Sequence, residues 1–251
     1  MLITEKTAHE AAKKAGNLIV TDICIGVGYT GVVLSNGECG IAYTIRDGLG
    51  PRCGAMDNAG KLIGINASQA LDMAMSLNLA EAAVGVATAN AILNADYPAG
   101  INALEEMIVE HGDVLGTIGY FHPVMNKFSP NAAKIHIFER RITDTGLLPD
   151  WAENIYLPQC DVVVITGVTF INKTIDHVLS LCTKAREIVV MGASACMAPE
   201  ILKEYGVTVV AGSRVFDAEG IMRVIAQGGG GQDVLDYLQK LCVRISPPHK
   251  C

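Results

Sequence analysis

Two uninterrupted apolar runs constrain the fold of this chain more than any other feature of its sequence. Residues 162–165 are Val-Val-Val-Ile, and residues 188–191 are Ile-Val-Val-Met. A strand that is apolar on both faces must be covered on both faces, as strands are in a parallel sheet with helices on either side. The sequence therefore predicts an α/β protein built on a buried parallel sheet.

The second part of the chain alternates between strand and helix patterns. The predicted strands are residues 114–119, 134–139, 161–166, 188–192 and 207–212. Between the third and fourth strands, residues 174–182 have the apolar spacing of one helix face. We interpret residues 99–251 as a Rossmann-like, doubly wound domain.

Four consecutive glycines, residues 228–231, interrupt this domain near its end. A last amphipathic helix is predicted beyond them. The apolar side of that helix would carry Val234, Leu235, Leu238, Leu241 and Cys242.

The first part of the chain has a different organisation. Residues 4–15 predict a surface helix, and three β-branched runs separated by turn sequences indicate an antiparallel meander. The runs are residues 18–27, 31–34 and 40–44. Two further helices are predicted at residues 68–77 and 79–95. We interpret residues 1–98 as an α+β domain.

Composition and charge exclude several classes of function. The net charge is −7 and no dense basic run occurs, so nucleic acid is not an expected partner. The longest uncharged stretch, residues 23–37, contains glycines and polar residues and is too short to span a membrane. Charged residues near the amino terminus argue against a secretory signal. We expect a cytoplasmic protein whose eight cysteines are free thiols, because none forms a CxxC pair.

The predicted sheet indicates where a ligand would bind. In open α/β sheets, ligands lie beyond the carboxyl ends of the strands. Glu139 ends the second predicted strand, 20 residues after Gly119, a spacing at which nucleotide-binding domains place an acid that accepts hydrogen bonds from ribose. The alternative is a solvated acid that pairs with Arg140 or Arg141. The loop after the first strand has one glycine and bulky side chains, so ordinary dinucleotide binding is not expected.

The same edge of the sheet offers a possible set of metal ligands. His122, Glu139 and Cys196 supply nitrogen, oxygen and sulfur, so a divalent metal ion is the cofactor that the sequence leaves open. The alternative for Cys196 is a small, buried side chain. Asn172 and Thr174 either contact a ligand or cap the helix that begins there.

Several short motifs, taken in order, resemble one protein family. They are residues 26–34 (GVGYTGVVL), 89–91 (ANA), 119–121 (GYF), 138–140 (FER) and 165–174 (ITGVTFINKT). Their order is similar to that in the bacterial and archaeal family called putative heavy-metal chelation proteins, and the resemblance covers nearly the whole chain. It implies an enolase amino-terminal-like domain, a Rossmann-like domain and a site between them, without enolase activity.

The resemblance also implies a set of ligand-binding residues. They are Tyr29, Thr30, Asn90, Tyr120, Phe121, Thr166, Asn172, Thr174 and Ser194, together with Glu139. Hydroxyl and amide groups suit a polar organic ligand better than a soft metal ion. Asn90 lies in an apolar helix, where a structural hydrogen bond to a neighbouring loop is the alternative role.

Two functions follow as hypotheses. The first is a small-ligand-binding protein that holds a heavy-metal ion or a metal compound in an interdomain cleft. The second is an enzyme acting on a small heterocyclic or nucleotide-like compound, with Glu139 as hydrogen-bond acceptor or general base. A sensor without turnover and assembly into a homo-oligomer are left open.

Overall fold

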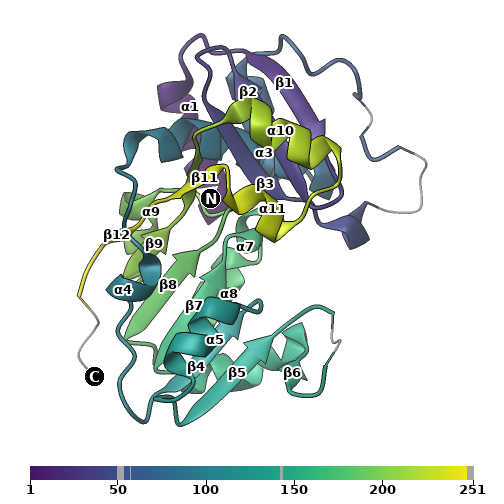
Figure 1. Ribbon diagram of the computed structural model, residues 1–251. Coiled ribbons are helices and arrows are strands. Elements are labelled where there is room, and N and C mark those ends of the chain that lie inside the picture. The colour runs from purple at the N-terminus through teal and green to yellow at the C-terminus, as the bar shows by residue number, and fades with distance from the viewer. Residues whose placement is uncertain (50–53, 57, 142–143, 248–251) are drawn as a thin grey trace.

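The protein is an α/β molecule in which a small antiparallel sheet lies beside one edge of a larger, mostly parallel sheet (Figure 1). The computed structural model describes residues 1–49, 54–56, 58–141 and 144–247. Within them, the small sheet has three strands, the large sheet has seven, and a two-stranded hairpin forms a third sheet. The predicted α/β class with a buried parallel sheet is confirmed.

The amino-terminal part contains the predicted meander and the helices that flank it. Its elements are α1 (Ile3–Ala15), β1 (Val20–Ile25), β2 (Tyr29–Leu34), β3 (Cys39–Tyr43), α2 (Ala67–Asp72) and α3 (Leu79–Leu93). The helix predicted at residues 68–77 is shorter than expected, because the chain tightens into a 3₁₀ turn, η2 (Met73–Met75). Asn78 begins α3, and its side chain accepts hydrogen bonds from two backbone N–H groups of the first turn.

Helix α3 packs on one face of the three-stranded sheet and is almost completely buried. Only Leu79 and Glu81 among its residues are not buried. The helix approaches β3 so closely that a Cβ at Gly40 would lie 2.1 Å from the carbonyl oxygen of Ala87. The absence of a side chain at Gly40 therefore permits a backbone contact that any other residue would prevent.

The large sheet has the strand order β12-β9-β8-β7-β4-β5-β6. Its strands are β4 (Val114–Ile118), β5 (Lys134–Phe138), β6 (Leu147–Leu148), β7 (Val162–Thr166), β8 (Glu187–Met191), β9 (Val209–Ala211) and β12 (Val243–Arg244). All neighbouring pairs are parallel except β12 with β9. The six parallel strands, numbered as they occur in the chain, follow the order 3-2-1-4-5-6 known from doubly wound sheets.

Alternate side chains of these strands enter two different cores. Val162 and Val164 of β7 pack with α4 (Ala103–Glu106) and α5 (His122–Phe128). Val163 and Ile165 belong to the other core, which includes α7 (Val168–Ile171) and α8 (Ile175–Leu181). Further short helices are α6 (Glu153–Tyr156) and α9 (Pro199–Lys203). The uninterrupted apolar run of β7 thus reflects coverage on both faces.

The last part of the chain returns to the small sheet. Helix α10 (Ala218–Ala226) packs on β1 and β2, on the face opposite α3 (Figure 1). Met222 and Ile225 of α10 share a core with Cys39 and Ile41 of β3. The division of the chain at residues 98 and 99 remains a prediction, but α10 crosses from the second part to the first.

The prediction of a single amphipathic helix after the four glycines is wrong. The chain forms a short helix, α11 (Gly231–Leu235), and then the strand β11 (Leu238–Lys240), which pairs with β10 (Ser213–Val215). The next residues form β12 at the edge of the large sheet. Pairing with an available strand edge overrides the local helical pattern, because strand formation depends on tertiary neighbours.

Two further expectations concern thiols and membranes. Six cysteines are described, and all are free thiols: Cys24, Cys39, Cys160, Cys182, Cys196 and Cys242. Cys53 and Cys251 lie outside the described residues. No helix within the described ranges has the length and apolarity needed to cross a membrane.

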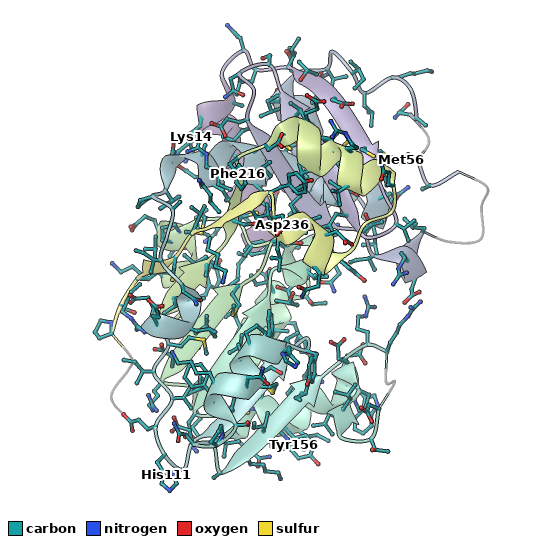
Figure 2. The ribbon with its side chains drawn as sticks, in the orientation of Figure 1. Lys14, Met56, His111, Tyr156, Phe216 and Asp236 are labelled. Atoms are coloured by element: carbon teal, nitrogen blue, oxygen red, sulfur yellow. The ribbon has the colours of Figure 1, made fainter. Side chains whose placement is uncertain are left out.

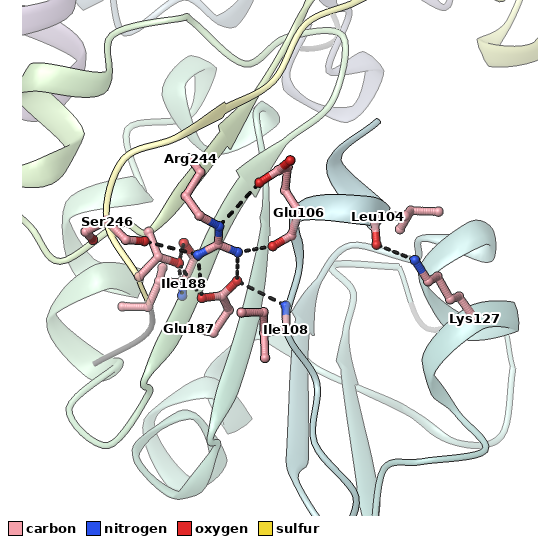
Figure 3. Close-up of polar contacts among 9 residues, drawn as sticks. Leu104, Glu106, Ile108, Lys127, Glu187, Ile188, Arg244 and Ser246 are labelled. Carbon is pink, nitrogen blue, oxygen red and sulfur yellow. Dashed lines mark hydrogen bonds and ion pairs between the residues drawn. The ribbon is translucent and has the colours of Figure 1, made fainter. Parts of the chain in front are cut away.

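A buried ion pair attaches β12 to the sheet (Figure 3). The Nη2 atom of Arg244 lies 2.8 Å from Oε1 of Glu187, a fully buried carboxylate, and Nε lies 3.4 Å from Oε2 of Glu106. The backbone N–H of Ile108 and the hydroxyl of Thr208 also donate to Glu187. The network joins the end of the chain to β8 and to the segment that precedes β4.

We predict that Arg244→Met lowers the free energy of unfolding by about 3 kcal/mol, because it leaves the Glu187 carboxylate buried without a cation. Urea unfolding would measure the change. The control is Arg223→Met, which removes the exposed Arg223–Glu219 pair on α10 and should cost less than about 0.5 kcal/mol. Equal losses in the two variants would contradict the prediction.

Candidate functional site

A cleft lies between the carboxyl ends of the parallel strands and the amino-terminal part of the chain. Its volume is about 720 Å³. Residues at the ends of β4, β5, β7 and β8 line one side, and residues of β2, β3 and the 3₁₀ turn η1 (Arg46–Gly48) line the other. His111, in the loop before β4, marks the opposite edge of the sheet, away from the small sheet (Figure 2). The cleft thus lies at the edge of the sheet that the sequence predicted.

The topology of the sheet opens this cleft. β4 and β7 are neighbours, but the helices that follow them, α5 and α7, pack on opposite faces. A crevice forms where the connections diverge, and this is where ligands of doubly wound sheets bind. Gly119 after β4 and Gly192 after β8 have φ values of +93° and +123°, which only glycine adopts without strain.

Eight of the residues predicted to contact a ligand line the cleft. They are Tyr29, Tyr120, Phe121, Glu139, Thr166, Asn172, Thr174 and Ser194. They come from four separate strand ends and from the small sheet, so only the fold brings them together. Their roles toward a ligand stay predictions.

Glu139 is held by the loop that follows the neighbouring strand. Its Oε1 atom accepts a hydrogen bond of 2.8 Å from the backbone N–H of Tyr120. The alternative, a pairing of Glu139 with Arg140 or Arg141, is not observed, because Arg141 pairs with Asp47 and Nε of Arg140 lies 3.9 Å from Asp150. Glu139 therefore faces the cleft with Oε2 unbonded to any residue that the structure describes.

Asn172 and Thr174 organise the turn before α8. The Oδ1 atom of Asn172 accepts hydrogen bonds from the backbone N–H and the hydroxyl of Thr174, at 3.1 and 2.8 Å. Thr166 acts similarly after β7, where its hydroxyl accepts from the N–H of Val168. Thr174 precedes the first residue of α8 without a side-chain capping hydrogen bond, so the capping alternative is not observed, and both residues of this turn line the cleft.

Thr30 and Asn90 do not line the cleft. Thr30 is fully buried in the meander, with its hydroxyl 3.0 Å from that of Thr44. Asn90 is 3% exposed, and its Nδ2 atom donates to the carbonyl oxygens of Ile41 and Ala193 at 2.9 and 3.4 Å. The structural alternative for Asn90 therefore describes its observed contacts, and its influence on the cleft passes through Ala193.

The loop at residues 192–197 is the joint between the two parts. Ser194 is 3% exposed and its hydroxyl accepts a 2.8 Å hydrogen bond from the N–H of Tyr43 in β3. Asn94, one helical turn after Asn90, accepts from the N–H of Met197 and donates to the carbonyl oxygen of Ala195. Sequence reasoning missed Asn94, although its spacing from Asn90 places both amides on one face of the helix.

The predicted metal ligands His122, Glu139 and Cys196 are not brought together. No group of three or more His, Cys, Asp or Glu side chains suited to a metal ion occurs among the described residues. Burial raises the pKa of the Cys196 thiol to about 12, so the thiolate that a metal requires is disfavoured. His122 begins α5 outside the cleft, with Nδ1 3.1 Å from the side-chain amide of Asn126.

The mouth of the cleft carries charges that sequence reasoning did not assign to the site. Arg46, Arg140 and Arg141 line it, together with Asp47 and Asp150. The Arg141–Asp47 ion pair joins the loop after β5 to η1 and so spans the two parts of the molecule. The adjacent arginines 140 and 141 were the available signal, but nothing in the sequence identifies their partners, since Asp47 lies 94 residues from Arg141.

Glu153, the first residue of α6, was missed completely. It lines the cleft and is 8% exposed, and its carboxyl group makes no hydrogen bond or ion pair with any described residue. Burial and the nearby charge of Asp150 raise the pKa of Glu153 to about 7. No strand or helix pattern marks the segment between β5 and β7, so the sequence offered no reason to select this carboxyl group.

Comparison with known proteins assigns the chain to a family. A profile of the family described as "Putative heavy-metal chelation" matches residues 102–244, and a second profile with the same description matches residues 8–93. An uncharacterized protein of Methanocaldococcus jannaschii is 28% identical over 228 residues, which make up 86% of each chain.

Two solved structures share the fold. A protein of unknown function from Pyrococcus horikoshii superposes with a TM-score of 0.82 at 24% identity, over 97% of this chain and 100% of that one. A protein of unknown function from Desulfitobacterium hafniense gives a TM-score of 0.82 at 23% identity, over 96% and 98% of the two chains. With both profiles aligned to the two parts that form the cleft, the chain belongs to the "Putative heavy-metal chelation" family.

Proposed function

We propose that this protein binds a small organic anion with a flat ring system in the cleft, and that any heavy metal arrives as part of such a compound. The observation that carries the proposal is the cavity of about 720 Å³, lined by aromatic rings and arginines from both parts of the chain. A volume of this size suits a ligand in the range of cofactors and drug-sized molecules.

Aromatic side chains supply apolar walls for a ring. Tyr29 and Tyr43 lie edge to face, with ring centroids 6.0 Å apart. Tyr120 and Trp151 line the cleft and are 53% and 64% exposed, so their rings are available to a ligand. Stacking against such rings favours a planar ligand.

The arginines supply positive charge at the mouth. Arg140 and Arg141 are near acidic partners, whereas Arg46 forms no ion pair with a described residue. A guanidinium group matches carboxylate and phosphate geometry with paired hydrogen bonds. Arg46 is therefore the residue we assign to the anionic group of the ligand.

The donor set argues against a bare metal ion. The described cleft residues are mainly hydroxyls, amides, arginines and separated carboxylates, without a cysteine, and arginines repel a cation. An organic compound that already chelates a metal would meet the cleft through its own rings and anionic groups. This form of the proposal agrees with the family description without a protein metal centre.

An enzyme acting on a heterocyclic or nucleotide-like compound is the second candidate. Glu139 and Glu153 line the same cavity and come from the two sides of the loop region between β5 and β7. A pair of carboxyl groups in different surroundings is a common basis for acid–base chemistry. Glu139 remains the proposed hydrogen-bond acceptor or general base.

We predict that adenosine monophosphate, used as a heterocyclic anion, changes the emission of Trp151 and that adenosine does so less at equal concentration. Trp151 is the only tryptophan in the chain, so its emission reports occupancy of this cleft. Arg46→Gln should weaken the response to the monophosphate by roughly tenfold, since a charge-assisted hydrogen bond is lost.

The control for this titration is Arg223→Gln, because Arg223 lies on α10 and pairs with Glu219 away from the cleft. It should titrate like the wild type. If Arg46→Gln and Arg223→Gln behave alike, the charge assignment is wrong.

We predict that Zn²⁺ alone is removed by dialysis from the wild type and from the triple variant His122→Ala, Glu139→Gln, Cys196→Ser to the same extent. These residues do not form a metal site, so their loss should not change metal content. Elemental analysis after dialysis measures the result. One equivalent of zinc retained by the wild type and lost from the variant would restore the metal-ion hypothesis.

We predict a pH-dependent stability from Glu153. Its raised pKa keeps the native carboxyl group protonated up to about pH 7, whereas the unfolded chain releases this proton above the ordinary glutamate pKa of 4.5. The native state therefore binds more protons between these values, and the free energy of unfolding falls as the pH rises through them, by about 3 kcal/mol at most.

Glu153→Gln removes this titration. Urea unfolding should show the variant gaining stability relative to the wild type between about pH 5 and about pH 8. Glu105→Gln, at an exposed residue of α4, is the matched control and should track the wild type. A constant difference between wild type and Glu153→Gln across this range would refute the prediction.

A further inference from the structure

The Glu153 side chain occupies an unusual position for a carboxyl group. It begins α6 in the wall of the cleft, and its residue is 8% exposed. Buried carboxyl groups normally accept hydrogen bonds from donors, and leaving one without donors costs stability. No described residue donates a hydrogen bond to the Glu153 carboxyl group, whose oxygens are open to the cleft. A ligand in the cleft is therefore the available partner for this group.

The groups around Glu153 favour its neutral form. Asp150, in the 3₁₀ turn η4 (Asp150–Ala152), adds a negative charge, and Arg140 compensates only in part. On the side of α8 lies the Cys182 thiol. Burial, with a smaller contribution from the negative charge of Glu153, raises the pKa of Cys182 to about 12. His177 of α8 and Glu139 line the same cleft, and η5 (Leu157–Gln159) carries no ionisable side chain.

We propose that Glu153 is the hydrogen-bond donor of the cleft and that it selects anionic heterocycles with an acceptor nitrogen in the ring. This inference rests on the proposed function and names the ligand class for it. A neutral carboxyl group can donate one hydrogen bond, which an ionised one cannot do. The arginines meet the anionic group of the ligand, and Glu153 meets the ring nitrogen.

The proposal couples binding to a proton. When free Glu153 is ionised, its carboxylate takes one proton from solvent as the ligand binds, and the O–H bond that forms points to the ring nitrogen. The bond that breaks is that of the same proton to a hydronium ion or buffer acid in solvent, and release of the ligand returns the proton to solvent. Affinity should therefore fall as the pH rises above the pKa of Glu153, which is about 7.

A matched pair of probes tests the inference by isothermal titration calorimetry. Quinoline-2-carboxylate has a ring nitrogen, and naphthalene-2-carboxylate is a similar flat anion with carbon at that place. The wild type should prefer the quinoline by about tenfold or more at about pH 6, and that preference should shrink by about tenfold at about pH 8. At about pH 8, heats in buffers of different ionisation enthalpy should show uptake approaching one proton for the quinoline alone.

Two variants distinguish the effect of the Glu153 carboxyl group from that of the rest of the site. Glu153→Gln keeps a donor of the same shape but cannot titrate, so it should retain the preference for the quinoline and lose both the pH dependence and the proton uptake. Glu105→Gln should behave as the wild type does. Because Glu153→Gln is tested for a changed pH profile rather than for lost binding, a merely structural role would not produce this result.

The outcomes distinguish the two proposals. Binding of both probes with equal affinity, or without proton uptake at about pH 8, overturns the role of Glu153 and leaves the proposed function standing. Failure of both carboxylates and of adenosine monophosphate to bind overturns both. A carboxyl-carbon NMR titration of the free wild type gives a further check, since an apparent pKa of Glu153 below about 5 would also overturn the inference.

Discussion

The burial of α3 between the small sheet and the loop at residues 192–197 is the constraint on which the rest of the structure depends. Asn90 and Asn94 carry amide groups into an apolar interior, where unbonded polar groups cost about 1–3 kcal/mol each. Their Nδ2 atoms bond to backbone carbonyl groups on both sides of the interface, including those of Ile41 and Ser213. These bonds form in one relative arrangement of the two parts, so the polar groups fix that arrangement.

Close backbone contacts reinforce the same arrangement. Gly40 allows α3 to pack closely on β3. Gly167 allows the loop after β7 to pack closely on Ala195, because a Cβ at Gly167 would lie only 2.3 Å from the backbone nitrogen of Ala195. The hydroxyl of Ser194 accepts a hydrogen bond from the backbone N–H of Tyr43 across the joint. The walls of the cleft are therefore held by buried contacts behind them, while the side chains that face the cavity stay available to a ligand.

The distribution of charge within the cleft explains why an organic ligand fits it better than a metal ion. Arginines surround the mouth, where solvent moderates their charge, and the Arg141–Asp47 pair spans the opening. In the wall of the cleft, burial raises the pKa of Glu153 to about 7, and the charge of Arg140 lowers it only in part. Arginines beside Asp47 and Asp150 at the mouth, together with an acid of raised pKa in the wall, suit a molecule with an anionic end and a polar ring. The Tyr29, Tyr120 and Trp151 rings supply the surfaces between these ends.

The sequence by itself determined the parallel sheet and the meander, because these depend on local patterns, and its resemblance to the family indicated eight of the residues that line the cleft. Apolar runs such as residues 162–165 require burial on both faces, and strand ends such as Glu139 and Thr166 fall at one edge whatever else the chain does. The predictions of the last helix and of the metal site were wrong because they depend on contacts between residues that are distant in the sequence. Leu238 became part of a strand because β10 offered it a pairing edge, and His122 and Cys196 were placed apart by helix orientation and burial.

Tertiary structure alone decided the identity of the charged partners and of the buried acid. Arg141 meets Asp47 from the other part of the chain, and Asn94 reaches Met197 across the joint, contacts that no spacing in the sequence encodes. Glu153 looks like any surface glutamate in the sequence. It acquires its burial and its raised pKa only when the segment after β6 folds against the cleft, because desolvation depends on everything that surrounds a group and not on its neighbours in the chain.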